Sequence, residues 1–226
     1  MPKLIIIPTP IGNLSDVSYR IIENLKQVQL LLAEDTRQTK KLLNHYQIEV
    51  KLQAYHQHNE HRLTPSLIER MQTEDLEVGL VSDAGMPGIS DPAFLLIKAA
   101  VEAGIAVECL PGPTALVPAL VVSGFPCDRF CFEGFLPHKK GRQKRLKSLA
   151  EEERSMVFYE SPNRILKFLK EIAIHLGEDR PVAVCKELTK IHEQVYRGRV
   201  IELIEFFEKE KTIKGEFAIV IHGKKQ

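Results

Sequence analysis

The sequence has no tryptophan, only four cysteines and no long uninterrupted apolar run. The cysteines show no CxxC spacing, which argues against a disulfide framework or a zinc site and favours a reducing compartment such as the cytoplasm. The first apolar stretch ends at Pro8, too early for a signal peptide or a membrane span. A soluble, cytoplasmic protein with no membrane partner is expected.

An excess of charge of one sign is also missing, because the formal net charge is +1 over 226 residues. A polyanionic partner would have to be met by a local basic patch and not by the field of the whole molecule. The hydrophobic content of 44% and the charged content of 27% are typical of a globular protein. The length suits one large domain or two domains of about 100 residues each.

Short β-rich runs alternate with helical patterns through the first half of the chain. The runs KLIII, QLLLA, VGLVS and VECL are separated by stretches of helical length, among them 17–26, 36–46 and 92–103. This alternation predicts crossover units and a largely parallel sheet covered on both faces. Ligands of such sheets bind outside the carboxyl ends of the strands, so function should be sought in the loops there.

The texture of the sequence changes after Ser123. The run SGFPCDRFCFEGFLPHKKGRQKRLK combines prolines, aromatic residues and basic residues, and we interpret it as a linker into a second unit. Beyond it, SMVFYES, VAVCKEL and EFAIVIHG alternate with helical patterns over 163–176 and 200–209, with a turn at QVYRG. Strand patterns near VYRGR and FAIVI favour a mixed sheet. The expected fold is α/β in two domains, residues 1–115 and 116–226.

The loop PTPIGNL follows the first strand. Pro8 restricts the backbone and the glycine frees it, so this loop could hold a fixed shape against a ligand. The alternative is a plain turn in which Ser15 or Asp16 caps a helix that begins at Val17.

The loop AEDTR follows the second strand and places Glu34 and Asp35 before Thr36, which could cap the next helix. Capping accounts for one acid and leaves the other, together with Arg37, available at the end of a strand. A purely structural role as a helix cap and a functional role at a site are equally supported for this loop.

Three histidines, His56, His58 and His61, lie in AYHQHNEHR with spacings that could ligate zinc if carboxylates helped. The segment is wholly polar and opens a surface helix, where such residues are usually solvated. No metal is therefore expected, and a polar wall made by His56, Asn59 and Glu60 is the preferred functional interpretation.

The stretch LVSDAGMPGISDP carries an acid at the end of a strand, Asp83, followed by small residues that give backbone room. It matches neither a dinucleotide fingerprint nor a P-loop. An acid in this position can accept the ribose hydroxyls of a nucleoside-like ligand. The structural alternative is a turn in which Ser90 and Asp91 cap a helix from Pro92.

Two further segments invite a ligand. PGPTALVPAL predicts a helix from Thr114 whose free amide groups could bind a carboxylate or an adenine edge, or it is only an interdomain turn and a core helix. HKKGRQKRLK, residues 138–147, holds six lysines or arginines and no acid. That concentration indicates a local positive surface suited to phosphates, with a solvated helix start as the alternative.

Taken together, these motifs resemble a known family. IPTPIGNLSD, LLAEDTRQTKKLL, YHQHNE, LVSDAGMPGISDP, PGPTALVPAL, FEGFLPHKKGRQKR and FYESPNR occur in the order and spacing of the ribosomal RNA small subunit methyltransferase I family, of the tetrapyrrole methylase superfamily. The resemblance implies S-adenosylmethionine as methyl donor and two α/β domains with the donor in the cleft between them. It further implies a homodimer and 2′-O-methylation of a cytidine in the decoding region of 16S rRNA, with the rRNA within the small ribosomal subunit as the partner and no DNA partner.

The resemblance also assigns residues. Those implied to bind the donor are Pro8, Asp83, Gly85, Met86, Pro87, Thr114, Ala115, Tyr159, Glu160, Gly215 and Glu216. Met86 stands where the family often has threonine, which removes any hydroxyl contact there and leaves a backbone role. Ala93 and Asn163 depart from the usual glycine and histidine.

A ribose hydroxyl is a weak nucleophile, so a base or a hydrogen-bond acceptor is expected beside it. Among the polar candidates we expect Glu34 and Asp35 to act first, with Arg37 fixing a phosphate. The residues expected to contact RNA are His56, Lys139, Lys140, Arg142, Lys144 and Arg145. The alternatives are a methylase of a small molecule or of a protein side chain on the same fold, and a non-catalytic RNA-binding assembly protein.

Overall fold

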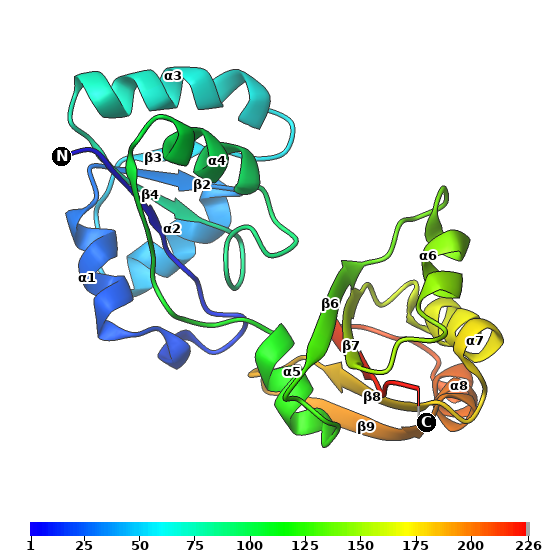
Figure 1. The fold of residues 1–226 in the computed structure, drawn as a ribbon. Coiled ribbons are helices and arrows are strands. Elements are labelled where there is room, and N and C mark those ends of the chain that lie inside the picture. The colour runs from blue at the N-terminus through cyan, green and yellow to red at the C-terminus, as the bar shows by residue number, and fades with distance from the viewer. Residues whose placement is uncertain (225–226) are drawn as a thin grey trace. The chain divides into compact units, whose positions relative to one another are not determined.

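A computed structural model describes residues 1–224 and divides the chain into two compact units, Met1–Thr114 and Ala115–Gln226, each with its own sheet (Figure 1). Within the described residues, no helix has the length and apolar character needed to cross a membrane.

The first unit is built on a parallel sheet of five strands in the order β3-β2-β4-β1-β5. The strands are β1 (Lys3–Ile6), β2 (Leu30–Ala33), β3 (Leu52–Ala54), β4 (Glu77–Val81) and β5 (Ala106–Cys109). The helices are a 3-10 turn (Leu14–Asp16), α1 (Tyr19–Gln27), α2 (Thr36–His45), α3 (Glu60–Thr73) and α4 (Phe94–Glu102). The predicted parallel sheet is confirmed.

Both faces of this sheet carry apolar side chains, because successive residues of a strand point to opposite sides. On one face Leu4, Ile6 and Leu80 pack with side chains of α3 and α4. On the other face Ile5 and Leu31 pack with side chains of α1 and α2. Figure 1 shows the two helix pairs on opposite sides of the sheet. Burial on both faces explains why the strands are continuous apolar runs.

The order of the strands creates a crevice beside β4. The helix after β4 lies on one face, whereas the helices after its neighbours β1 and β2 lie on the other. Loops that leave adjacent strands toward opposite faces diverge at the carboxyl ends, and ligands of α/β proteins bind at such switch points. The loop after β4 therefore lies between two divergent neighbours.

Several local expectations for this unit were wrong. Ser18, and not Ser15 or Asp16, caps α1, since its hydroxyl accepts the amide proton of Ile21. Ala93 precedes α4 without a side-chain cap, so the expected capping by Ser90 and Asp91 does not occur. Strand β3 was missed because it is short and only partly buried.

The second unit holds a mixed sheet of five strands in the order β6-β7-β10-β8-β9. Only β6 and β7 run parallel, and the other pairs are antiparallel, which confirms the expected mixed sheet. The strands are β6 (Phe130–Phe135), β7 (Ser155–Glu160), β8 (Pro181–Lys186), β9 (Gln194–Arg199) and β10 (Phe217–Ile221). The helices are α5 (Leu116–Ser123), α6 (Arg142–Ser148), α7 (Ile165–Leu176) and α8 (Val200–Lys209).

Helices cover the two faces of the mixed sheet unequally. Three of them, α6, α7 and α8, pack their apolar side chains onto one face and form its main core. The other face is covered by α5, which packs mainly against β7, β8, β9 and β10. Beneath α5 lies Cys185, fully buried, with its sulfur 3.9 Å from the carbonyl oxygen of Ala119.

The structure corrects the sequence interpretation here too. Residues 130–135, taken as part of a linker, form strand β6. The strand pattern near VYRGR is confirmed as β9, which includes all of QVYRG, so the turn expected there is wrong. Helix α5 begins at Leu116, two residues later than the expected start at Thr114.

Candidate functional site

The loops after β1 and β4 are joined to each other by backbone hydrogen bonds. Thr9 and Gly85 each donate an amide proton to the other's carbonyl oxygen, both at 2.9 Å. The buried Thr9 hydroxyl also donates to the carbonyl of Ser82 at 3.2 Å. Gly85 has a φ of +85°, a backbone conformation that residues other than glycine rarely adopt. The two loops are thus held as one unit, with Pro8 buried at its base.

A hollow of about 290 Å³ lies beside these joined loops. Its wall combines the β1 loop, the first turns of α2 and the residues directly after β4. The lining residues include Pro10, Gly12, Gln38, Thr39, Asp83 and Ala84. The side chain of Asp83 and the backbone around exposed Ala84 are therefore accessible to a ligand.

Asp83 also connects the β4 loop to the β2 loop, because its carboxylate accepts the amide proton of Asp35 at 3.0 Å. Burial raises the pKa of Asp83, and the hydrogen bond from Asp35 opposes that rise. The half-buried Glu34 has its pKa raised by burial first and by the nearby Asp83 second. The structure thus brings Glu34 and Asp83 to the same end of the sheet, as their positions after adjacent strands require.

Asp35 and Arg37 form a closed local pair. Asp35, and not Thr36, caps α2, since its carboxylate accepts the amide proton of Arg37 at 2.8 Å. The guanidinium of Arg37 donates to the same carboxylate at 2.6 Å and at 3.0 Å. These bonds hold the pKa of Asp35 down to about 2. Asp35 is therefore a poor proton acceptor, and Arg37, with its side chain 86% exposed, is accessible to an anion.

Asp91 joins these acids, although the sequence suggested only a helix cap for it. Burial, followed by the charge of Glu34, raises its pKa to about 7, while a hydrogen bond from Ser82 opposes the rise. The residue before it, Ser90, has a φ of +70°, an uncommon conformation for a residue other than glycine. In the sequence, the only indication of a role for Asp91 was its position as a further acid in a loop of small residues.

His56 lies on the same side of the unit and interacts electrostatically with Glu34. Its Nε2 lies 3.3 Å from the amide nitrogen of Asn59, whereas its Nδ1 is buried without a hydrogen-bond partner among the described residues. The rings of His56 and His58 meet edge to face at 5.9 Å. Over residues 1–224, no group of three His, Cys, Asp or Glu side chains is arranged to hold a metal ion.

The remaining donor candidates of the first unit, Met86, Pro87 and Thr114, lie in or close to the β4 loop. Met86 is partly buried against the core below α4, with its sulfur 3.6 Å from that of Cys109, and Pro87 is buried. Thr114 lies close to Gly85, since a Cβ on that glycine would be 3.9 Å from the Cα of Thr114. Ala115 begins the second unit and precedes α5 without a side-chain cap.

In the second unit, two segments meet at one end of the strands of the mixed sheet. Tyr159 and Glu160 end β7, Gly215 and Glu216 precede β10, and the antiparallel pairing of Phe217 with Glu160 places them side by side. The structure thus brings together all four of these candidates.

Two residues to which no role in donor binding was assigned lie at the same end of the sheet. Glu187 has a φ of +53°, and its carboxylate accepts the amide proton of Glu216 at 2.8 Å. Lys190 donates to Glu187 at 2.9 Å and to Glu216 at 3.0 Å. Although burial opposes it, these bonds raise the pKa of Lys190. Non-glycine residues at positive φ cluster at functional sites, and such backbone strain was not visible in the sequence.

The side chain of Glu160 is buried within its own unit. Its carboxylate lies 2.7 Å from the guanidinium of Arg164 and accepts the amide proton of Ser161 at 2.8 Å. The ion pair holds its carboxylate inside the unit, so a contact of Glu160 with the donor stays a prediction for its backbone alone.

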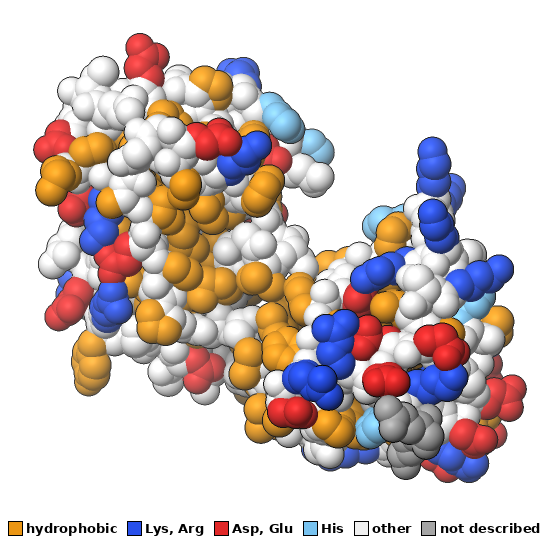
Figure 2. Space-filling model, in the orientation of Figure 1, with side chains coloured by type: hydrophobic (Ala, Val, Ile, Leu, Met, Phe, Trp, Pro, Cys, Tyr) orange, Lys and Arg blue, Asp and Glu red, His pale blue; other side chains and the backbone are white. Residues whose placement is uncertain are grey.

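The basic residues of the run 138–147 differ in their exposure to solvent. Arg142 is 3% exposed, and its guanidinium lies 2.7 Å from Glu171, so the expected RNA contact by Arg142 is wrong. Arg145 donates twice to Glu133, both at 2.7 Å. Lys139, Lys140 and Lys144 are exposed, and within residues 1–224 none of them takes part in an ion pair. Figure 2 shows Lys and Arg side chains gathered over the loop before α6.

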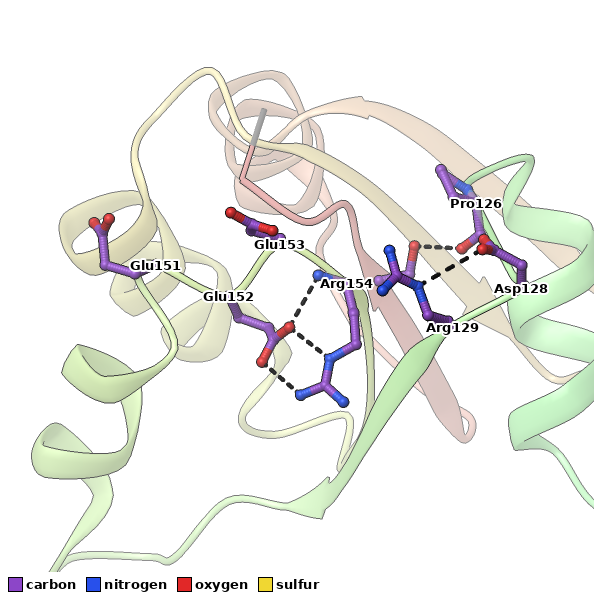
Figure 3. Close-up of a pocket in the computed structure, with 8 residues that line it drawn as sticks. Pro126, Asp128, Arg129, Glu151, Glu152, Glu153 and Arg154 are labelled. Carbon is purple, nitrogen blue, oxygen red and sulfur yellow. Dashed lines mark hydrogen bonds and ion pairs between the residues drawn. The ribbon is translucent and has the colours of Figure 1, made fainter. Parts of the chain in front are cut away.

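A second hollow, of about 370 Å³, lies in the second unit at the opposite ends of β6 and β7 (Figure 3). Acids dominate it: Asp128, Glu151, Glu152 and Glu153 line it. Its two arginines are already paired, with Arg154 2.8 Å from Glu152 and Arg129 3.8 Å from Asp128. A surplus of carboxylates repels phosphates, so this hollow does not suit a polyanion.

Comparisons with known proteins agree on the family. The model of the tetrapyrrole (corrin/porphyrin) methylases matches residues 3–204. Diphthine synthase has the same fold, with a TM-score of 0.75 and 13% identity over 98% of this chain and 90% of that one. The cobalamin biosynthetic enzyme cobalt precorrin-4 methyltransferase follows with a TM-score of 0.67 and 19% identity over 97% and 94%. These likenesses confirm the tetrapyrrole methylase fold.

Sequence relatives narrow the family further. The chain is 46% identical to ribosomal RNA small subunit methyltransferase I of Thermotoga maritima over 224 residues, 99% of this chain and 100% of that protein. It is 49% identical to the protein of the same name from Synechocystis, over 99% of this chain and 80% of that one. With identity at nearly every second position along its length, this chain belongs to the ribosomal RNA small subunit methyltransferase I family of tetrapyrrole methylases.

Proposed function

We propose that this chain transfers a methyl group from S-adenosylmethionine to the ribose 2′-oxygen of a cytidine in the decoding region of 16S rRNA. The observation that carries the proposal is the identity of 46% over 224 residues to a ribosomal RNA small subunit methyltransferase. The rRNA in an assembled small subunit is the proposed substrate, the cytoplasm the proposed place of action and a homodimer the proposed form.

The residues at the β4 loop fit a nucleoside donor. The bonds between Thr9 and Gly85 fix the loop, exposed Ala84 leaves room for close approach, and Asp83 presents a carboxylate that can accept ribose hydroxyl protons. When bound, the donor supplies an activated methyl group attached to a positively charged sulfur. Residues of both units are proposed to bind it, namely Pro8, Asp83, Gly85, Met86, Pro87, Thr114 and Ala115 together with Tyr159, Gly215, Glu216 and the backbone of Glu160.

The acids beside this loop are proposed to assist the reacting hydroxyl. The 2′-oxygen forms a bond to the methyl carbon as the bond from that carbon to sulfur breaks, and the hydroxyl proton must pass to an acceptor. Glu34 suits this role because its raised pKa makes it a stronger base than an ordinary carboxylate. Arg37 is proposed to hold a phosphate, and Asp35 to orient Arg37 through their hydrogen bonds. His56 is proposed to contact the RNA.

The test gives the purified protein labelled S-adenosylmethionine with small ribosomal subunits, and separately with naked 16S rRNA, from cells lacking this enzyme. Nuclease digestion and mass spectrometry then locate the label. We expect label on one ribose in the decoding region, with subunits as the better substrate. If the donor binds but neither sample becomes labelled, the rRNA assignment is wrong, and small-molecule or protein acceptors come next.

The same assay tests the acids. We expect Glu34→Gln to lower turnover by about a hundredfold, the usual contribution of general base catalysis. Asp35→Asn keeps a good helix cap, so any loss there reports on the orientation of Arg37 and not on α2. Glu69→Gln, an exposed acid of α3, serves as control and should match the parent. Turnover of both site variants within a few fold of the parent would contradict the assignment.

A further inference from the structure

A β-bulge in strand β6 places aromatic side chains in one row. The pairing with β7 shifts between Phe132 and Gly134, so that Phe132 lies opposite Val157 and Phe135 lies opposite Tyr159. Regular alternation would send Phe132 and Phe135 to opposite faces of the sheet, because they are three residues apart. The extra residue returns Phe135 to the face of Phe132 and Tyr159. Bulges commonly re-aim a side chain next to a functional site.

The aromatic row consists of Phe130, Phe132, Phe135 and Tyr159, all of them at least partly exposed to solvent. The ring of Tyr159 lies 5.1 Å from that of Phe132 and 5.6 Å from that of Phe135, both nearly edge to face. Phe135 is 51% exposed and Phe130 is 38% exposed. Phe130 and Phe135 lie on the face of the sheet that α5 covers. They are at the border of the covered area, because α5 packs mainly on β7, β8, β9 and β10 and not on β6.

Positive charge adjoins the aromatic row. The basic loop leaves the sheet directly after Phe135, and its exposed Lys139 and Lys140, with Lys144 of α6, have no carboxylate partner among the described residues. On the opposite face of β6, Glu133 is neutralised by Arg145. Aromatic rings beside cations are the two elements by which proteins bind unpaired nucleotides, with bases stacked on the rings and phosphates at the cations.

We propose that the three phenylalanines of the aromatic row form a stacking surface for unpaired bases of the RNA substrate, with Tyr159 supporting the rings of Phe132 and Phe135, and with Lys139, Lys140 and Lys144 holding the adjoining phosphates. The inference rests on the proposed function and names how the RNA is recognised. A second copy of the chain fits this surface less well, because a symmetric interface would bring the same lysines of two copies together. A single strand of RNA complements both its rings and its charge.

The absence of tryptophan from the chain allows a direct test. Phe135→Trp introduces a single tryptophan whose fluorescence reports on stacking. The probe is an RNA hairpin with an unpaired cytidine-containing loop, compared with a blunt duplex of the same stem. We expect the hairpin to quench the tryptophan and the duplex to leave it nearly unchanged.

Affinity at several salt concentrations separates stacking from charge. We expect Phe135→Leu to weaken hairpin binding about tenfold at every salt concentration, the usual contribution of one stacked base. Changing Lys139, Lys140 and Lys144 to glutamine should lower the salt slope by about 2, as three lost phosphate contacts on a single strand require. Phe206→Leu, on α8 and exposed by 38% like Phe130, is the matched control and should bind as the parent does.

Each contrary result has its own meaning. Normal hairpin affinity of Phe135→Leu, with no quenching of Phe135→Trp, would overturn the proposal. Loss of S-adenosylmethionine binding in Phe135→Leu would assign the row to the donor, and a lower mass in light scattering would assign it to an interface between copies. Quenching by the hairpin in a protein that methylates no rRNA would leave the stacking surface intact and overturn only the proposed function.

Discussion

Asp91 is a carboxylic acid that the fold holds beside two others, Glu34 and Asp83, and partly away from water. Its pKa of about 7 lies far above the value near 3.8 expected in an unfolded chain. Between these two values the folded protein keeps a proton that the unfolded chain releases. The stability connected with this proton is complete below pH 4 and is lost as the pH rises to 7.

We expect Asp91→Asn to remove this pH dependence, because asparagine resembles the protonated acid. The variant should gain stability over the parent by about 1–2 kcal/mol on going from pH 5 to pH 8, a figure reduced for partial solvent screening. Thermal unfolding across that range measures it. Asp128→Asn removes an exposed carboxylate of the second unit and controls for general charge removal. A gap between Asp91→Asn and the parent that stays constant with pH would refute the explanation.

Residues paired across long sequence distances were the hardest to interpret from the sequence. The basic run was correctly read as a concentration of charge, but its member Arg142 is buried because Glu171, 29 positions away, pairs with it. A linear pattern contains no information on such a partner. The helix caps failed for a different reason, since several neighbouring Ser and Asp residues offered equal signals and packing selected Ser18 and Asp35.

At the scale of elements, the buried central strands were predictable, whereas two of the edge strands, β3 and β6, were not. The central strands β1, β2 and β4 lack charged residues, apart from the first residue of β1 and of β4, because helices cover both sides of the sheet. The edge strands β3 and β6 lack that pattern, being partly exposed, and the bulge in β6 breaks its alternation. The crevice beside β4 followed from the order of elements, whereas the placement of Glu187 and Lys190 depends on backbone conformation.

The turn before β10 lies against Glu187, the residue that directly follows β8. Gly215 has a φ of +101°, and a Cβ on it would lie 2.7 Å from Cγ of Glu187. Gly177, after α7, has a φ of +106° but no atom within 4 Å of such a Cβ. Alanine at either position carries the same backbone strain, and only at Gly215 does it also displace Glu187.

We therefore expect Gly215→Ala to destabilise the protein by about 1 kcal/mol more than Gly177→Ala, whose own cost is about 1–2 kcal/mol. Urea unfolding measures both. Adding Glu187→Ala should relieve the excess, since it removes the atoms that clash. Equal costs for the two glycine variants would show that Glu187 moves aside freely and does not fix the turn.

On the scale of the whole molecule, the apolar interior follows the division into units. Two clusters lie on the faces of the parallel sheet, and one lies beneath α6, α7 and α8 on the mixed sheet. Each sheet is thus stabilised by helices of its own unit. A single free energy of unfolding need not describe a chain with separate cores, and each unit requires its own probe.

The buried thiol of Cys185 provides that probe for the second unit. Burial raises its pKa to about 12, so neither solvent nor thiolate chemistry reaches it while α5 stays on the sheet. Exposed Cys109 and Cys127 should react with iodoacetamide within minutes, and Cys185 far more slowly. Mass spectrometry of timed samples follows all three. Labelling of Cys185 as fast as Cys127 would show that α5 does not protect it. Slow labelling of Cys185 would instead measure the rate at which α5 detaches and exposes the interior of the second unit, without any engineered probe.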